Sequence, residues 1–253
     1  MYGAVTRARN CFLYTKKGIR LTDLFQEDGR AILGWAGGNA YTFMKNAMNR
    51  GVSGSFITES SDRVEKAVSK LFNSNRQIAY FSNKADAIKY ALLFSKESTI
   101  VWKPWSTFQQ DISSVKSIVF APTFPWTDSI YIVAIQKDLY SENIELDDFA
   151  KNKMKIPFPL QAGIARSIYN LIEALSERKE TDWFIYDSIL TKYWTRKGPY
   201  LFPKVPKENY DKFILHCLSL GIIINPNYDS PSIVPFGADK GVFTKLKNTP
   251  FNC

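Results

Sequence analysis

The residues best suited to binding a charged ligand lie where an apolar segment, QIAYF, meets the sequence SNKADA. The apolar segment predicts a strand, and the apolar spacing of residues 85–95 predicts a helix after it. The first turn of a helix has free backbone N–H groups and a partial positive charge, which suits a phosphate group. The candidate phosphate-binding residues are Ser82, Asn83, Lys84 and Ala85. The alternative is an ordinary N-cap without a ligand, with Asn83 or Ser82 as the capping residue.

Nucleophilic catalysis of the Cys–His or Ser–His–Asp kind would require His216, because the sequence has one histidine. The segment KFILHCLSL predicts a helix and places His216, next to Cys217, on or near the packed face of that helix. We therefore favour a structural role for this histidine. Cys11, Cys217 and Cys253 are few and far apart, which argues against a disulfide framework and against a zinc site. No metal site is expected.

Length and composition indicate a globular protein with enough chain for a sizeable core. The 253 residues are 45% hydrophobic, 23% charged and 15% aromatic, which excludes the disordered and collagen-like classes. No apolar run approaches the roughly 20 residues that a membrane-spanning helix needs. The first residues contain arginine and lysine without a long apolar core, so no secretory signal is expected. The prediction is a reduced, cytoplasmic protein.

The positive charge is concentrated towards the N-terminus. The formal net charge is +9, and residues 1–100 carry 15 of the 33 basic residues but 8 of the 24 acidic ones. Such a half could face nucleic acid, acidic lipid or a phosphorylated ligand. The basic residues form no dense cluster, so the preferred interpretation is a lysine-rich surface that keeps the protein in solution.

Apolar spacing predicts the order helix–strand–helix–strand over residues 63–102, which is typical of a parallel sheet with crossover helices. Residues 17–25 predict a strand, and Asp28-Gly29 predicts a hairpin turn that leads into a returning strand at 31–33. Further strands are expected at 117–120 and 130–135 and, in a second sheet, at 200–205, 221–224 and 232–234. Further helices are expected at 40–50, 160–175, 182–195, 207–219 and 240–247.

The order of these segments resembles class III aminotransferases, which are fold-type-I pyridoxal-phosphate-dependent enzymes. KGIRLTDLFQEDGRAIL resembles the hairpin with which these enzymes open, and QIAYFSNKADAIKYALLFSK resembles their strand, phosphate-binding turn and following helix. KFILHCLSLGIIINPNYDSPSIVP resembles the helix and terminal strand of their small domain. The resemblance covers most of the chain in order. It implies pyridoxal phosphate as the family's cofactor and a homodimer as the assembly.

Several residues depart from the family's phosphate-binding turn, F-x-N-S-G-T-E-A. Alignment with FSNKADA places Asn83 on the serine, Lys84 on the glycine and Ala85 on the threonine, while Asp86 falls on the glutamate. A lysine side chain crowds a position where glycine lets the backbone approach a phosphate, and alanine lacks the threonine hydroxyl. We find no segment that matches the family's Tyr-His-Gly, Asp-Glu or Ser-Lys-x-x-Gly-Gly-Gly motifs. Lys137 is the least unsuited candidate for the Schiff-base lysine, and a solvated lysine at a strand end is the alternative.

The resemblance implies an α/β fold of the pyridoxal-phosphate transferase type. A reduced, mainly parallel sheet with flanking helices is expected, together with a small α+β C-terminal domain. Residues 29–157 would form the reduced large domain. Residues 1–28 and 158–253 would form the small domain, with a connecting helix at 160–175. The chain is shorter than the family's enzymes, and the missing part falls between the strand at 99–102 and this helix.

The preferred functional hypothesis is a catalytically inactive aminotransferase-like protein that carries no cofactor. It would bind a small anionic metabolite in the remnant cofactor cleft or act through dimer or protein contacts. The turn that begins at Ser82 would form one wall of this cleft. The Pro/aromatic loop with Thr123, Trp126 and Thr127 would form another, with a packing role for this loop as the equal alternative.

Two other functions are left open by the sequence. One is an active pyridoxal-phosphate enzyme with a relocated catalytic lysine. The other is a binder of nucleic acid or of an anionic surface through the basic N-terminal half. Tyr80, Phe81 and Tyr90 would then stack on bases while Lys84 and Lys89 contact phosphates. Nucleic acid is the less favoured partner, because strand and helix periodicity already explains these aromatic residues as core.

Overall fold

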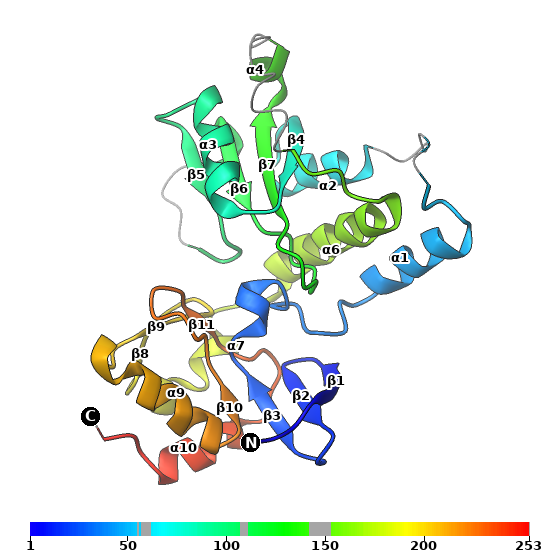
Figure 1. The fold of residues 1–253 in the computed structure, drawn as a ribbon. Coiled ribbons are helices and arrows are strands. Elements are labelled where there is room, and N and C mark those ends of the chain that lie inside the picture. Colours follow the sequence, from blue (N-terminus) through cyan, green and yellow to red (C-terminus); the bar gives the residue numbers. More distant parts are fainter. Residues whose placement is uncertain (55, 57–61, 107–110, 142–152, 253) are drawn as a thin grey trace. The chain divides into compact units, whose positions relative to one another are not determined.

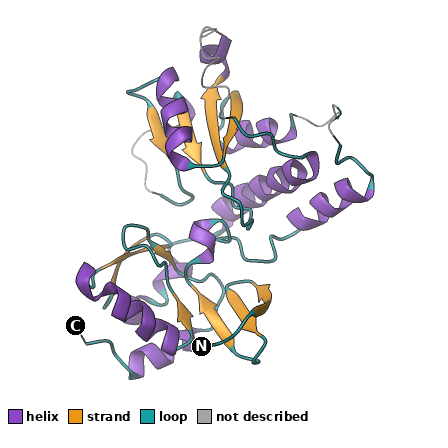
Figure 2. Cartoon of the chain, in the orientation of Figure 1, coloured by secondary structure: helices purple, strands orange, loops and turns teal. Residues whose placement is uncertain are grey.

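The chain forms two compact units in a computed structural model that describes residues 1–54, 56, 62–106, 111–141 and 153–252 (Figures 1 and 2). Unit 1 combines Met1–Gly37 with Glu177–Cys253, and unit 2 is Gly38–Ser176. The whole of the predicted connecting helix, residues 160–175, thus belongs to unit 2, whereas the expected domain boundaries grouped it with the C-terminal segment.

Unit 2 contains a four-stranded sheet and helices around it (Figure 1). Its strands are β4 (Arg76–Phe81), β5 (Thr99–Val101), β6 (Ser117–Phe120) and β7 (Tyr131–Gln136). Its helices are α1 (Ala40–Asn49), α2 (Arg63–Leu71), α3 (Lys84–Phe94), α4 (Lys137–Ser141) and α6 (Phe158–Glu177), with a 3-10 turn at Ile112–Ser114. The helices and strands predicted for this part of the chain are confirmed to within a few residues.

The sheet of unit 2 has the strand order β4-β7-β6-β5. β5 pairs with β6 in parallel, whereas β7 pairs with both β4 and β6 in antiparallel fashion. β4, β6 and β5 therefore point the same way, as the helix–strand rhythm predicted. Three of the four strands are thus parallel to one another, as expected for a mainly parallel sheet. The hydrogen-bonded pairing is mostly antiparallel, however, because β7 lies between β4 and β6 and two of the three strand pairs include it.

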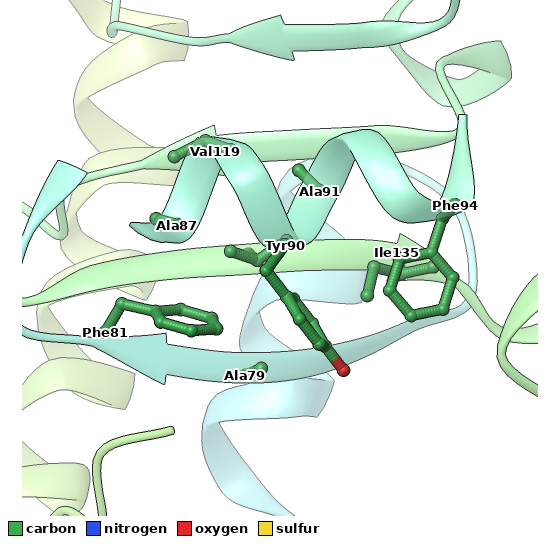
Figure 3. Packing of buried hydrophobic residues seen from close by; sticks show 9 residues of the cluster. Ala79, Phe81, Ala87, Tyr90, Ala91, Phe94, Val119 and Ile135 are labelled. Carbon is green, nitrogen blue, oxygen red and sulfur yellow. The ribbon is translucent and has the colours of Figure 1, made fainter. Parts of the chain in front are cut away.

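The core of unit 2 lies between α3 and the sheet. Ala87, Tyr90, Ala91 and Phe94 form a buried stripe along α3, and Figure 3 shows them facing Phe81 and other residues of the strands. The spacing of three and four residues matches one face of a helix. Leu92 lies outside this stripe and is 37% exposed, because the aromatic residues at 90 and 94 take the buried positions.

A buried arginine ties the 3-10 turn of unit 2 to its sheet. Arg76 is 1% exposed, and its Nε donates to Ser74 Oγ over 2.7 Å. Its two terminal nitrogens donate to the carbonyl oxygens of Lys116 and Ala134 and of Ile112 and Ser113, over 3.2–3.4 Å. Burial lowers the pKa of Arg76 to about 10, and the charge of Asp138 partly opposes this shift.

Unit 1 contains two small sheets. One has the order β1-β2-β3-β10 and the other the order β11-β9-β8. The strands are β1 (Val5–Arg9), β2 (Phe12–Thr15), β3 (Arg20–Asp23), β8 (Trp194–Lys197), β9 (Tyr200–Pro203), β10 (Ile222–Ile223) and β11 (Ser232–Ile233). The helices are α7 (Thr181–Phe184), α8 (Asp187–Leu190), α9 (Tyr210–Ser219) and α10 (Thr244–Asn248), with 3-10 turns at Gln26–Gly29, Lys207–Asn209 and Lys240–Phe243.

Unit 1 departs from the sequence prediction at four places. The single helix expected at 182–195 is two short helices, α7 and α8, and its last residues begin β8. The β1–β2 hairpin was not predicted, and the three later strands divide between two sheets rather than sharing one. The expected hairpin after β3 is a left-handed turn, with φ between 46° and 54° at Gln26, Glu27 and Asp28. Residues 31–33 continue as a turn rather than as a returning strand. The Asp28-Gly29 dipeptide thus supplies left-handed backbone but not the expected strand pair.

Candidate functional site

The turn before α3 is closed by its own side chains. Asn83 caps the helix, with its Oδ1 accepting the Asp86 N–H over 2.8 Å. Asn83 Nδ2 in turn donates to Asp86 Oδ2 over 2.6 Å. Ser82, Lys84 and Ala85 are exposed around this cap. The arrangement is therefore an N-cap of the ordinary type, with a carboxylate in the first turn of the helix.

This turn does not fit the phosphate of pyridoxal phosphate. The Asn83 side chain already accepts the Asp86 N–H, one of the backbone donors at the helix start that a phosphate would need. Lys84 has a bulky side chain where class III aminotransferases have glycine. Ala85 lacks the hydroxyl of the threonine with which it aligns.

The strand directions place the predicted loop at the same edge of the sheet as this turn. Phe81, the last residue of β4, pairs with Tyr131, the first residue of β7, and the loop at 121–130 connects β6 to β7. Thr123 is 2% exposed and its Oγ1 donates to Ser167 O over 3.5 Å. Thr127 is exposed, and Trp126 stacks on Phe124 at 6.0 Å between ring centroids. Thr123 thus packs inside unit 2, whereas Trp126 and Thr127 remain accessible.

Lys137 lies at the opposite edge of the sheet. It follows Gln136, which pairs with Arg76 at the start of β4, whereas the turn follows the end of β4. The six residues of β4, each advancing about 3.3 Å, separate the end of the sheet with Lys137 from the end with the turn. Lys137 is exposed and begins α4, and its backbone N–H donates to Asn75 O over 3.1 Å. The structure therefore does not bring Lys137 and the turn at Ser82–Ala85 together.

His216 contacts the C-terminal segment of unit 1. Its Nε2 lies 3.0 Å from Thr249 O, and its ring lies 5.4 Å from the Phe251 ring. The neighbouring Cys217 is fully buried, and burial raises the pKa of its thiol to about 12. A thiol with this pKa stays protonated at neutral pH and is a poor nucleophile. The described residues include no group of three or more His, Cys, Asp or Glu side chains that could hold a metal ion.

The aromatic residues considered for nucleic-acid stacking are mostly in the core. Phe81 and Tyr90 are 1% and 0% exposed, and Figure 3 shows both between α3 and the sheet. Another surface of unit 2 does combine cations with an exposed ring. Two adjoining cavities of about 300 and 470 Å³ share Phe43, which is 41% exposed, and Arg63. We call this surface the basic groove; its other cations are Arg50, Lys66 and Arg166.

Unit 1 contains a further cavity that sequence analysis did not predict. Its volume is about 270 Å³, and its lining includes Asn10, Cys11, Gln26, Ile32, Arg178 and Phe236. We call it the Arg178 cavity. The residues come from the β1–β2 turn, from the turn after β3 and from segments more than 140 residues later. No local spacing in the sequence joins these segments, although the glycine at position 34 is a local signal of close backbone approach.

Gly34 allows two turns to meet at the wall of this cavity. Its φ is 100°, and a Cβ atom there would lie 3.4 Å from Asn10 Cα. The next residue, Trp35, donates its backbone N–H to Asn10 O over 2.9 Å. Its indole Nε1 donates to Asp23 Oδ2 over 2.7 Å. Glycine is the residue that adopts this φ without strain, so position 34 fixes one wall of the cavity.

Asp23 holds the left-handed turn that carries Gln26. Its Oδ1 accepts the backbone N–H groups of Phe25 and Gln26, each over 2.9 Å. Asp23 is 1% exposed, and burial raises the pKa of its carboxyl group even though these donors favour the charged form. Left-handed backbone at non-glycine residues costs roughly 1–3 kcal/mol each and persists where surrounding contacts enforce it.

Comparison with known sequences finds two related bacterial proteins, and no protein-family model matches the chain. The protein from Treponema pallidum is 23% identical over 275 residues, which cover 92% of this chain and 89% of that protein. The protein from Borreliella burgdorferi is 24% identical over 254 residues, covering 98% of this chain and 90% of that protein. Both are named as uncharacterized proteins.

Comparison with solved structures finds aminotransferases over almost the whole chain. The ornithine aminotransferase of Plasmodium yoelii has a TM-score of 0.68 at 13% identity, covering 97% of this chain and 92% of that chain. The ornithine aminotransferase of Toxoplasma gondii has a TM-score of 0.69 at 9% identity, over 98% and 90%, and was crystallized with partial occupancy of PLP at its active site. None of the helices in the described part of this chain has the length and apolar character of a membrane span. The chain therefore has an aminotransferase-like fold.

Proposed function

We propose that the chain is a noncatalytic protein of aminotransferase-like fold that acts by binding a small anionic molecule. The observation that carries this proposal is the turn before α3, where Asn83 caps the Asp86 N–H and where Lys84 and Ala85 stand in place of the glycine and threonine of the family's phosphate-binding turn. The position of Lys137 at the far edge of the sheet supports it, because an imine-forming lysine has to reach the cofactor. Assembly into a homodimer remains a prediction.

The proposal predicts that added pyridoxal phosphate forms no specific imine. The purified protein should show no aldimine absorbance band, and borohydride reduction followed by peptide mass spectrometry should label no single lysine preferentially. Lys137→Ala is the matched variant and should give the same spectrum as the unchanged chain. A visible band together with one modified lysine would instead establish the active enzyme and identify its catalytic residue.

The basic groove supports a second candidate function, binding of a single-stranded nucleic acid. Asp62 pairs with Lys66 over 2.6 Å and Glu173 with Arg166 over 3.5 Å. Arg50 and Arg63 form no salt bridge within the described residues. Two cations beside an exposed phenylalanine ring suit a phosphate backbone with a stacked base.

Fluorescence anisotropy with an oligothymidylate tests this second function. Binding should weaken steeply with added salt, and Arg50→Ala combined with Arg63→Ala should lower the affinity about tenfold or more at low salt. The matched control is Lys212→Ala, which removes an exposed cation from α9 of unit 1. Absence of binding at low salt would eliminate this function and leave the small-anion proposal in place.

A further inference from the structure

We propose that the Arg178 cavity binds a small aliphatic carboxylate, with its carboxylate group at Arg178 and Gln26 and its hydrocarbon part against Ile32 and Phe236. This inference rests on the proposed binding function and gives it a site and a ligand class. The site lies wholly within unit 1, whereas the sequence placed the anion in the remnant cleft of unit 2.

Arg178 is held in place at the wall of the cavity. Its guanidinium carbon lies 3.7 Å from the centre of the Phe236 ring, and one terminal nitrogen donates to Ile32 O over 2.9 Å. A guanidinium group oriented in this way presents a planar set of N–H donors that matches a carboxylate. Burial lowers the pKa of Arg178 to about 10, an effect that Asp182 and Glu177 oppose, so the group is charged at neutral pH.

Gln26 contributes a donor that the folded chain leaves unused. The side chain is 2% exposed, and its Nε2 has no hydrogen-bond partner among the described residues. A buried amide donor without a partner costs about 1–3 kcal/mol, which a bound acceptor would recover. The backbone of Gln26 is fixed by Asp23 in left-handed conformation, so the side chain is placed at the cavity by the turn itself. A carboxylate oxygen is the acceptor that both Gln26 and Arg178 can share.

The size and remaining lining restrict the ligand to a compact molecule. The volume of about 270 Å³ lies slightly below the range of about 300–1,000 Å³ that drug-sized ligands occupy. Ile32 and Phe236 add apolar surface. Cys11 adds a neutral group, because burial raises the pKa of its thiol to about 11. One cation beside neutral polar and apolar groups favours a short monocarboxylate over a phosphorylated or highly charged ligand.

Isothermal titration calorimetry with isovalerate tests the assignment on the full chain without pyridoxal phosphate. Isovalerate should bind saturably at one site. Isovaleramide, which has the same shape without the charge, should bind about tenfold more weakly or worse. Equal affinity for the two compounds, or no binding of isovalerate, would overturn the assignment.

Two cavity variants and one control locate the site. Arg178→Met keeps an unbranched side chain over Phe236 but removes the cation, and it should abolish isovalerate binding. Lys179→Met removes the neighbouring exposed cation, which does not line the cavity, and should bind like the unchanged chain. An equal loss in both variants would contradict a site at Arg178.

Gln26→Met keeps the test decisive if Arg178→Met fails to fold. It removes the unpaired amide, so the melting temperature should stay level or rise while isovalerate affinity falls about tenfold. Unchanged affinity in a folded Gln26→Met protein would remove the amide from the site. A pyridoxal-phosphate imine would overturn the noncatalytic function but not this binding result. Failure of isovalerate to bind, with no imine, would overturn the cavity assignment alone.

Discussion

Replacement of Arg76 by methionine is expected to lower the free energy of unfolding of unit 2 by about 3 kcal/mol. The guanidinium group donates to five oxygen atoms, four of them carbonyl oxygens. These bonds join Lys116, just before β6, together with β7 and the 3-10 turn at Ile112–Ser114, to the start of β4. Methionine fills much of the same space, so the loss comes mainly from hydrogen bonds rather than from packing. Relief of the buried charge offsets part of this loss, which keeps the expected value below that of a broken ion pair.

Urea unfolding measures this loss of stability. Hydrogen–deuterium exchange of the β4 and β7 amides assigns the loss to unit 2, which contains both strands. Arg63→Met is the matched control, because Arg63 is an exposed arginine of the same unit, and it should change stability by less than about 0.5 kcal/mol. If Arg76→Met exchanges and unfolds like the control, the guanidinium network is not an important source of stability.

Unit 1 is expected to lose stability steeply between about pH 9 and pH 12, by roughly 3–5 kcal/mol. Burial raises the pKa of Tyr186 and Tyr210 to about 12, and it raises those of Cys11 and Cys217 to about 11 and 12. In the unfolded chain these groups lose their protons near pH 10 and pH 9. The folded state then binds more protons than the unfolded state across this interval. The stabilisation that these groups contribute is therefore fully present below about pH 9, and it is lost as pH rises towards the folded-state pKa values.

Urea unfolding followed at several pH values between neutrality and pH 11 tests this dependence. Tyr186→Phe removes one of the titrating groups and should make the fall shallower. It also removes the bond from Tyr186 Oη to Ala238 O, at 2.5 Å, so its stability at neutral pH should be about 1 kcal/mol lower. An identical slope in Tyr186→Phe and in the unchanged chain would contradict the assigned role of the buried phenol.

The periodic elements could be predicted because their signal is local. The α1 and α2 helices and the β6 strand follow from residue spacing alone, and the structure places them within a few residues of expectation. The direction of β7 could not be predicted, because it depends on how the chain returns after β6 and not on the composition of the strand. The turn at Gln26–Asp28 was mispredicted because Asp-Gly favours left-handed backbone in more than one kind of turn.

The sequence could predict only those parts of the candidate site whose residues are close together in the chain. The N-cap at Asn83 was one of two interpretations of the same residues, and the structure shows the hydrogen bonds of this cap, while phosphate binding stays a prediction. The separation of Lys137 from that turn requires the ladder between β4 and β7. The Arg178 cavity requires the chain to bring residues 10–34 beside residues 178–237. Such contacts depend on packing over long sequence distances, which periodicity does not encode.

The pairing of β3 with β10 has a consequence for how the protein is made. Thr22 pairs with Ile222, so β3 leaves the ribosome about 200 residues before its partner strand. At ordinary translation rates of 5–20 residues per second, this delay is about 10–40 s. Unit 2 is encoded entirely within the interval and can fold first, while the free edge of β3 stays available for wrong pairing. A nascent-chain chaperone that covers this edge during synthesis is therefore expected to raise the yield of folded protein.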